Sequence, residues 1–236
     1  MKTNISIRLS YFLVAFSLLL ITSCKKENSQ NDKASGLIVY NMITDKAGVG
    51  IAINGNNFVP PPLEYTGFSG PYRAVQPGVA TIETFDYFNG NVLAQFPAQF
   101  KDSAYYSLFA MGNNESYQNV FVEDRLSTLP RGTGNAYIRF VNAIPDPSES
   151  NVIVTNSGNV VLNVNGNYGT VSEFQPVLPG NLNVSVVNAN HTIDATRSFT
   201  VKKDEIYTVL FAGVPLSVDT TRNIKILYNQ NGLVAP

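Results

Sequence analysis

Hydrophobic and polar side chains alternate along several short stretches of the chain. The alternation is clear over residues 137–141, 182–186 and 206–211. Because successive side chains of a β-strand point to opposite faces of a sheet, this two-residue period predicts strands. No window of 12 or more residues shows the period of an amphipathic helix together with capping residues. The pattern predicts an all-β chain with about seven short strands in every hundred residues.

Turn residues separate these stretches. Asn89-Gly90 lies between an apolar run at 81–88 and another at 92–96, a pattern typical of a β-hairpin because both turn residues accept a positive φ. The Pro-Gly pairs at 77–78 and 179–180 also predict turns, since proline fixes φ and glycine permits a left-handed conformation. We therefore expect antiparallel strands packed as an immunoglobulin-like β-sandwich.

The chain contains an internal repeat. Lys101-Asp102 and Leu108-Phe109-Ala110 recur 102 residues later as Lys203-Asp204 and Leu210-Phe211-Ala212. A repeat of this length predicts a duplicated structural unit. The other matches, offset by 101 to 104 residues, are Asn41 with Asn142, Asp45 with Asp146, Gly55-Asn56 with Gly158-Asn159, Tyr65 with Tyr168, Ser69 with Ser172, Pro77-Gly78 with Pro179-Gly180, and Asn119-Val120 with Asn223-Ile224.

The repeat predicts two tandem β-sandwich domains, at residues 37–130 and 131–236. Residues 130–134 (PRGTG) form the expected linker. A unit of roughly 100 residues can bury a core of its own, so we expect each domain to fold independently.

The N-terminal residues 1–23 have the features of a signal peptide. Lys2 and Arg8 precede an uncharged apolar run at 9–21, which at 13 residues is shorter than the roughly 20 needed to span a bilayer. The run ends in Ile21-Thr22-Ser23-Cys24, which resembles the bacterial lipobox. The resemblance implies that the Cys24 thiol accepts a diacylglycerol group and becomes the N-terminus after cleavage.

Residues 24–36 are expected to form the lipidated cysteine and a flexible tether, because the segment is polar and lacks aromatic residues. Cleavage removes Lys2 and Arg8 from the 16 basic side chains, leaving 14 against 17 acidic ones and a formal charge of −3. Multiple acyl chains anchor a protein stably where one chain does not.

Composition excludes several classes of function. Charged residues are only 14% and the formal charge of the whole chain is −1, which gives no global attraction to nucleic acid. One cysteine excludes a disulfide framework and a cysteine-rich zinc site, and one histidine excludes sites with several imidazoles. We expect no cofactor and no nucleic-acid partner.

The second half of the chain resembles a bacterial family of domains of unknown function, the one numbered 4397. The resemblance rests on AYIRFVNAIPD at 136–146, on Leu178-Pro179-Gly180 and on the residues between them, covers most of 135–215, and extends more faintly to 37–112. Asn142 stands where the family often has histidine, and Ile144 where it often has serine. The resemblance implies secreted or anchored β-sandwich modules without an assigned chemistry.

Acidic residues and His191 are the candidates for chemistry. His191 lies in a polar stretch between two predicted strands and is interpreted as a solvated turn residue. Several carboxylates could converge in a hydrolytic site, although most are expected to be solvated: Asp45, Asp86, Glu123, Asp124, Asp146, Glu173 and Asp204.

Asp45 and Asp146 occupy equivalent places in the two repeats. A duplicated aspartate could bind calcium, but the spacing of a calcium-binding loop is absent. We favour turns in which each carboxylate accepts backbone N–H groups.

Aromatic residues cluster in the connection 56–72 of the first repeat. Phe58, Tyr65, Phe68 and Tyr72 surround a proline run there, whereas the second repeat has asparagines at 163, 165 and 167. Aromatic faces in a loop can stack on a sugar or a partner protein, so these four residues form the predicted ligand-binding site. The alternative is that the rings cap the end of the sandwich core.

The sequence thus predicts a lipid-anchored, non-enzymatic module at the outer membrane that binds or displays a glycan or protein partner. One alternative is a structural subunit of a surface fibre, in which sheet edges pair between chains. The other is a carboxylate-dependent polysaccharide hydrolase.

Overall fold

The computed structural model describes residues 33–234, and its regular elements are sixteen β-strands and two short 3₁₀ helices. This confirms the all-β prediction for these residues. The expected signal peptide, Cys24 and most of the expected tether lie outside the described residues. The first strand begins at Ser35, so the last two residues expected in the tether belong to the fold. No helix within residues 33–234 is long and apolar enough to cross a membrane.

Eight strands form the first repeat, where the alternation predicted about seven. Asn89-Gly90 lies in the β5–β6 hairpin, as predicted. The strands are β1 (Ser35–Ile43), β2 (Val49–Ile53), β3 (Asn56–Asn57), β4 (Arg73–Val75), β5 (Gly78–Asp86), β6 (Val92–Phe100), β7 (Tyr105–Asn113) and β8 (Ser116–Glu123).

The second repeat contains eight equivalent strands. The 3₁₀ helix η1 (Leu126–Thr128) precedes it, and η2 (Thr220–Arg222) lies between its last two strands. The strands are β9 (Ala136–Asn142), β10 (Ser150–Asn156), β11 (Asn159–Asn165), β12 (Gln175–Val177), β13 (Gly180–Asn188), β14 (Asp194–Val201), β15 (Glu205–Ala212) and β16 (Lys225–Leu233).

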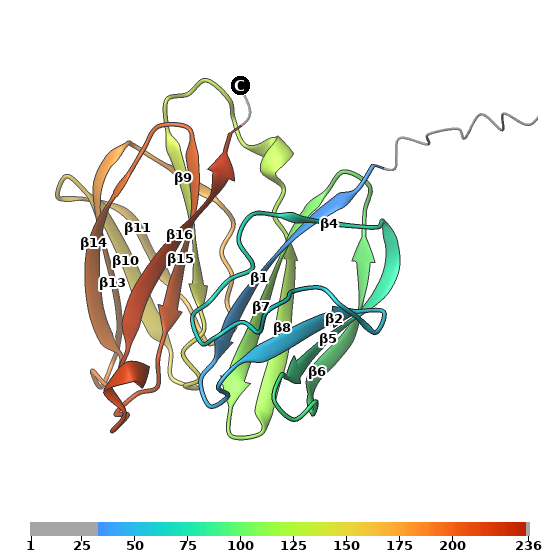
Figure 1. Ribbon diagram of the computed structural model, residues 1–236. Helices are drawn as coiled ribbons and strands as arrows, with labels where there is room; N and C mark the ends of the chain where they lie inside the picture. Colours follow the sequence, from blue (N-terminus) through green and yellow to red (C-terminus); the bar gives the residue numbers. More distant parts are fainter. Residues whose placement is uncertain (1–32, 235–236) are drawn as a thin grey trace, which may run out of the picture. The chain divides into compact units, whose positions relative to one another are not determined.

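Each repeat folds into two four-stranded sheets (Figure 1). In the first repeat the strand orders are β4-β1-β7-β8 and β3-β2-β5-β6, and in the second they are β12-β9-β15-β16 and β11-β10-β13-β14. The expectation of wholly antiparallel sheets is wrong at one place in each repeat, because β1 pairs with β7, and β9 with β15, in parallel. In the first repeat, β1 lies between its antiparallel neighbour β4 and its parallel neighbour β7. In the second repeat, β9 lies in the same way between β12 and β15.

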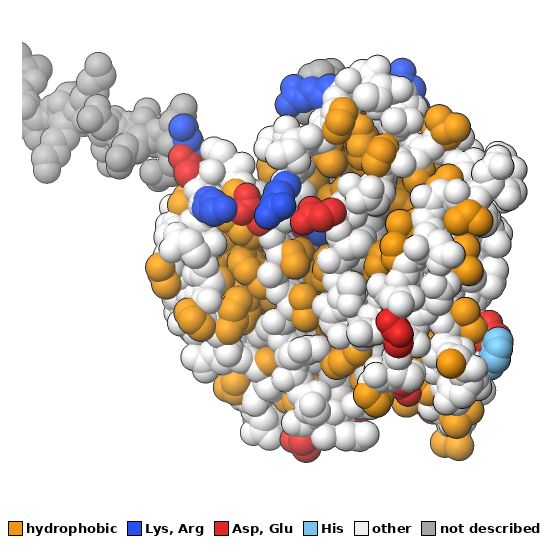
Figure 2. Space-filling model, turned by 180° about the vertical axis from the view of Figure 1, so that it is seen from behind, with side chains coloured by type: hydrophobic (Ala, Val, Ile, Leu, Met, Phe, Trp, Pro, Cys, Tyr) orange, Lys and Arg blue, Asp and Glu red, His pale blue; other side chains and the backbone are white. Residues whose placement is uncertain are grey.

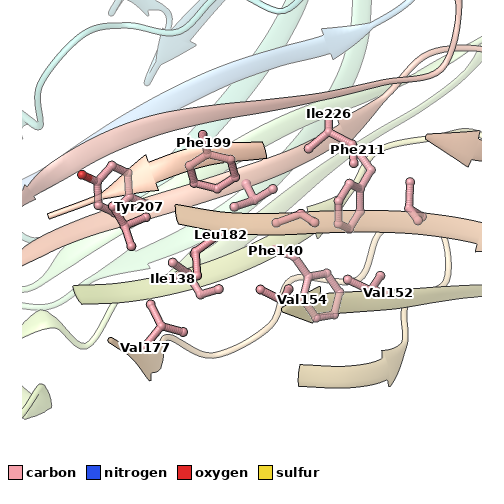
Figure 3. Close-up of a cluster of buried hydrophobic side chains, with 14 of the residues drawn as sticks. Ile138, Phe140, Val152, Val154, Val177, Leu182, Phe199, Tyr207, Phe211 and Ile226 are labelled. Carbon is pink, nitrogen blue, oxygen red and sulfur yellow. The ribbon is translucent and has the colours of Figure 1, made fainter. Parts of the chain in front are cut away.

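The two sheets of each repeat enclose a hydrophobic core. Figure 3 shows the core of the second repeat, in which Ile138, Phe140 and Phe211 come from one sheet. Val154 and Leu182 come from the other. The first repeat has an equivalent core built from β1, β2, β5, β6 and β7. These two cores agree with the predicted tandem β domains.

The strand pairing corrects the alignment of the repeats. Leu37 lies opposite Tyr106 in the first repeat, and Ile138 lies opposite Tyr207 in the second, so the offset along β7 and β15 is 101 residues rather than 102. Phe109 is therefore equivalent to Leu210, not to Phe211. Along the last strands the offset grows to 107, because the β15–β16 connection is longer than the β7–β8 turn.

A third hydrophobic cluster lies between the two repeats and is called here the inter-repeat cluster. Because the cluster covers the outer faces of two sheets, β1 and β9 are buried along their whole lengths. Burial on both faces is typical of parallel strands. The repeats thus share a core in addition to their own. Its buried members are Ile38, Tyr40, Met42, Phe109, Met111, Val141, Ala143, Leu210 and Ala212.

Candidate functional site

The connection between β3 and β4, which carries the four predicted aromatic residues, returns to the first strand of its own repeat. Phe68 forms an isolated β-bridge with Tyr40, and Val171 forms the equivalent bridge with Val141 in the second repeat. The Ser69 hydroxyl accepts a hydrogen bond from the backbone N–H of Val39 at 3.0 Å, as the Ser172 hydroxyl does from Phe140. These bonds confirm the predicted equivalence of Ser69 and Ser172.

Three of the four predicted aromatic residues lie at the inter-repeat cluster. Tyr65 and Tyr72 are half-buried and pack against the cluster. Phe68 is 39% exposed and stacks on the buried Tyr40 ring, with 5.8 Å between ring centroids. Phe58 lies apart, against the core of the first repeat. The structure therefore does not bring the four rings to one exposed surface.

Tyr65 contacts the second repeat through its ring face. The Arg222 guanidinium lies 4.5 Å from the ring centroid and the Lys225 ammonium 5.3 Å from it. Burial raises the pKa of the Tyr65 hydroxyl to about 12, and Arg222 offsets part of this effect. Tyr65 thus joins the two repeats, a role that differs both from ligand binding and from capping the core of one sandwich.

Tyr72 belongs to a buried polar group that the sequence did not predict as a unit. Its hydroxyl donates to Asp124 Oδ2 at 2.5 Å, and the Ser107 hydroxyl donates to the same oxygen at 2.7 Å. Arg139 Nη1 donates to Asp124 Oδ1 at 2.5 Å. Burial and the Asp124 carboxylate both raise the pKa of Tyr72. The Asp124 carboxylate therefore has three donors, one of which comes from the other repeat.

Arg139 completes this group from the second repeat. Its Nε donates to the Thr208 hydroxyl at 2.9 Å, and its Nη2 to the Ser107 hydroxyl at 2.6 Å. The guanidinium also lies over the Phe174 ring, 4.6 Å from its centroid. Arg139 and Asp124 are both almost fully buried. A single charge within the apolar stretch AYIRFVN was the sequence signal for this residue.

Three of the candidate carboxylates border one small hollow beside Arg139. Glu123, Asp124 and Glu173 line a space of about 40 Å³, which has room for only a few water molecules. Each carboxylate already has a cationic partner, because Glu123 pairs with Lys101 at 2.6 Å and Glu173 with Arg125 at 3.4 Å. The arrangement is a set of ion pairs around a small space.

The duplicated aspartates have different contacts: Asp146 stabilises its own turn, whereas Asp45 bonds to distant residues around the β7–β8 turn. Asp45 Oδ2 accepts from the backbone N–H of Asn114 at 2.9 Å and from the Tyr117 hydroxyl at 2.8 Å. Asp146 Oδ1 accepts from the backbone N–H of Ser148 at 2.8 Å, an Asx turn. Among residues 33–234, no group of three or more His, Cys, Asp and Glu side chains could hold a metal ion.

The remaining candidates also have local partners. Asp86 accepts from the backbone N–H of Phe88 at 3.0 Å within a hairpin turn. Asp204 lies 3.7 Å from Lys203 in the turn before β15. His191 lies in the β13–β14 turn, with Nδ1 3.1 Å from Asp194.

A second hollow lies between the β3–β4 connection of the first repeat and β16 of the second. Its volume is about 260 Å³, and it is lined by Phe68, Gly70, Pro71, Gln230, Asn231 and Gly232. Asn231 is 7% exposed, and its Nδ2 donates to the Tyr40 hydroxyl at 3.0 Å. Its Oδ1 has no hydrogen-bond partner among the described residues. No charged residue lines this hollow.

Charge is sparse on the face shown in Figure 2. Some of its Lys, Arg, Asp and Glu side chains form a short band, a few others lie toward the edges, and most of the rest of this face is uncharged. This face therefore offers little for recognition by charge alone.

Comparisons with known proteins bear on the family of this chain. No curated protein matches it. A putative cell adhesion protein from Bacteroides uniformis matches with 9% identity and a TM-score of 0.25, over 85% of this chain and 98% of that one. A second one from Bacteroides ovatus matches with 7% identity and a TM-score of 0.23, over 86% and 99%.

The family comparison gives a direct match in both repeats. One family model, described as a domain of unknown function (DUF4397), matches residues 35–146 and again residues 136–232. The two matches agree with the two sets of eight strands and overlap in β9. The resemblance noted in the sequence is thereby confirmed. The chain belongs to the DUF4397 family and carries two tandem copies of its domain.

Proposed function

We propose that the chain is a lipid-anchored, non-enzymatic module of the bacterial cell envelope that binds or displays a glycan or protein partner. One observation carries the anchor: the only cysteine of the chain stands at position 24, directly after the apolar run and Ile21-Thr22-Ser23. A diacylglycerol thioether needs a thiol, and small residues before it give a peptidase access to the backbone.

The binding role is supported by the described part of the chain. The acidic residues that could have formed a hydrolytic site are held by turn contacts or ion pairs, as at Asp146 and Glu123. The open hollow beside Phe68 is instead uncharged. An uncharged hollow with an aromatic wall suits binding better than acid–base chemistry, which requires titratable groups near the reacting atoms.

The same proposal places the protein at the outer membrane of a Gram-negative cell, with residues 24–34 as its tether. It also takes each repeat as an immunoglobulin-like sandwich. In support, two four-stranded sheets enclose one core in each repeat, and most of their strand pairs are antiparallel.

Metabolic labelling with a fatty acid tests the anchor. We expect label on the wild-type chain and none on Cys24→Ser, because serine cannot form the thioether. Membrane fractionation should recover the wild type with the outer membrane after detergent-free lysis. Equal labelling of the wild type and Cys24→Ser would contradict the proposal.

A surface-fibre subunit remains a second candidate because of strand β11. β11 lies at the end of its sheet, is seven residues long and carries no charged residue and no proline. Unpaired strand edges of this kind are templates for pairing between chains. The equivalent strand β3 has only two residues, so this particular edge is long only in the second repeat.

Assembly of the purified chain tests this second candidate. If β11 pairs between chains, the wild type should form filaments in electron micrographs and Val161→Lys should not, because a lysine at an edge opposes pairing. Val79→Lys is the control, since Val79 is 74% exposed but lies on β5, within a sheet. A wild type that stays monomeric at high concentration would contradict a fibre role.

A further inference from the structure

The hollow beside Phe68 has an equivalent elsewhere in the chain. Tyr106 lies opposite Glu123, and the equivalent Tyr207 lies opposite Gln230, so Glu123 corresponds to Gln230. The register of β16 then shifts, because Ile206 lies opposite Gly232, and Asn231 is the extra residue of a bulge. Asn231 follows Gln230 as Asp124 follows Glu123, and the side chains of Asn231 and Asp124 are both buried. The small hollow lined by Glu123 and Asp124 is therefore the counterpart of the larger hollow lined by Gln230 and Asn231. In the larger one, both acids are replaced by amides.

The two hollows differ in what fills them. The Arg139 guanidinium occupies the first and pairs with Asp124. The strand register places Ile38 at the position equivalent to Arg139, and isoleucine has no polar group to offer Asn231. The first hollow accordingly measures about 40 Å³ and the second about 260 Å³. The chain fills one copy of this site with its own side chain and leaves the other open.

Asn231 is left with one unpaired polar atom. Buried polar atoms nearly always have a hydrogen-bond partner, and an unpaired one costs about 1–3 kcal/mol. Asn231 Nδ2 is paired with the Tyr40 hydroxyl, and Oδ1 has no partner among the described residues. If the carboxamide were turned by half a rotation, nitrogen would be the unpaired atom instead. A hydroxyl group, which both donates and accepts, satisfies either arrangement.

Phe68 supplies an apolar wall beside this amide. Its ring is 39% exposed, and Tyr40 and Phe109 extend the stack behind it, with 5.8 Å and 4.9 Å between successive ring centroids. The ring is thus held in place by buried neighbours, so little conformational entropy would be lost on binding. The volume is just below the 300–1,000 Å³ typical of small-molecule pockets, which suits one ring rather than a larger ligand.

We propose that this hollow binds a neutral hexopyranose residue of a glycan, with one face of the sugar ring on Phe68 and a hydroxyl on the Asn231 amide. The exposed Gln230 amide can pair with a second hydroxyl. The proposal rests on the binding role given above and names its ligand class. A guanidinium from a protein partner fits less well, because the carboxylate that neutralises Arg139 in the other copy is an amide here.

Isothermal titration calorimetry with the full-length chain in detergent tests the proposal. The probes are maltohexaose, cellohexaose and laminarihexaose, which differ in linkage but share a neutral hexopyranose ring. At least one should bind, and Phe68→Ala should weaken that binding roughly tenfold or more, as for loss of a stacking anchor. Gln230→Ala should weaken it to a smaller extent. Val171→Ala changes the residue equivalent to Phe68 and should leave binding unchanged.

A second measurement does not depend on any variant. In ¹H–¹⁵N spectra of the wild type, the side-chain amide signals of Asn231 should shift when the bound saccharide is added. The proposal is overturned if none of the three saccharides binds, or if one binds without shifting these signals. It is also overturned if acetyl-Gly-Arg-Gly-amide shifts them and the saccharides do not. Labelling at Cys24 is independent of these results, so the anchor and the sugar site can fail separately.

Discussion

Arg139 of the second repeat donates a hydrogen bond to Asp124 of the first, with 2.5 Å between Nη1 and Oδ1 and with both side chains almost fully buried. A buried pair of charges is stabilising only when further hydrogen bonds satisfy the remaining donors and acceptors. Ser107, Thr208 and Tyr72 supply those bonds. This pair makes the stability of each repeat depend on the other.

Asp124→Asn should therefore destabilise the protein strongly. The substitution keeps the shape of the side chain but leaves the Arg139 charge buried without its counter-charge, which typically costs about 3–5 kcal/mol. Urea denaturation followed by circular dichroism measures the change. Glu123→Gln is the matched control, because the Lys101–Glu123 pair lies at the surface and exposed pairs contribute little to stability. Equal effects of the two substitutions would contradict a structural role for the buried pair.

The two repeats should unfold together, which differs from the independent folding expected from their length. Residues 131–236 expressed alone would expose Val141, Leu210 and Ala212 and would leave Arg139 without Asp124. We expect one cooperative thermal transition for the whole chain. Residues 131–236 alone should melt at a clearly lower temperature or self-associate. A monomeric second repeat with the melting temperature of the whole chain would show that the shared cluster contributes little.

The strands and the duplication could be predicted from sequence, but the side-chain directions in β15 could not. Aligning Leu108-Phe109 with Leu210-Phe211 matches identical residue types. The registers of β7 on β1 and of β15 on β9 nevertheless make Phe109 equivalent to Leu210. A shift of one residue moves a side chain to the other face of a sheet. Phe109 lies in the inter-repeat cluster, and Phe211 lies in the core of its own repeat. Since both faces are buried, hydrophobicity did not distinguish them.

The buried polar group around Arg139 and Asp124 was harder to predict than the strands. Arg139 was not among the predicted site residues, although it is a single charge in an apolar strand, and nothing in the sequence joins it to Asp124, which follows the last strand of the other repeat. Asp124 itself was expected to be solvated and is buried. Tyr65 and Tyr72 were grouped with Phe68 as loop aromatics, although only Phe68 is exposed. Contacts between the repeats depend on how their sheets pack against each other, and the pattern of hydrophobic and polar residues along one strand does not predict that packing.

High pH should unfold the protein partly through Tyr40. Burial raises the pKa of this hydroxyl to about 12 from an ordinary value of 10.0. In the unfolded chain the proton is lost near pH 10, so between pH 10 and 12 the unfolded state binds fewer protons and stability falls. Below pH 10 both states keep the proton, and Tyr40 adds no pH dependence.

Tyr40→Phe removes this titrating group. Thermal melts between pH 8 and 12, read with tyrosinate absorbance, should show a shallower loss of stability for Tyr40→Phe than for the wild type above pH 10. The absolute stability of the variant should be lower at pH 8, because Asn231 loses its hydrogen bond to the Tyr40 hydroxyl. Parallel losses of stability above pH 10 would contradict a contribution from Tyr40.

Single substitutions at Tyr72 and at Phe68 should have different effects on stability and on saccharide binding. Tyr72→Phe removes a hydrogen bond to the buried Asp124 carboxylate while keeping the ring that packs on Tyr105, and bonds to charged groups contribute about 1.5–3 kcal/mol. Phe68→Ala removes a ring that is 39% exposed, so its cost should be well below the 3–5 kcal/mol of a fully buried phenylalanine. Urea denaturation measures both costs.

Saccharide titration should then show weaker binding for Phe68→Ala and unchanged binding for folded Tyr72→Phe. If Tyr72→Phe stays within about 0.5 kcal/mol of the wild type but loses saccharide binding, Tyr72 belongs to the ligand site rather than to the junction between the repeats.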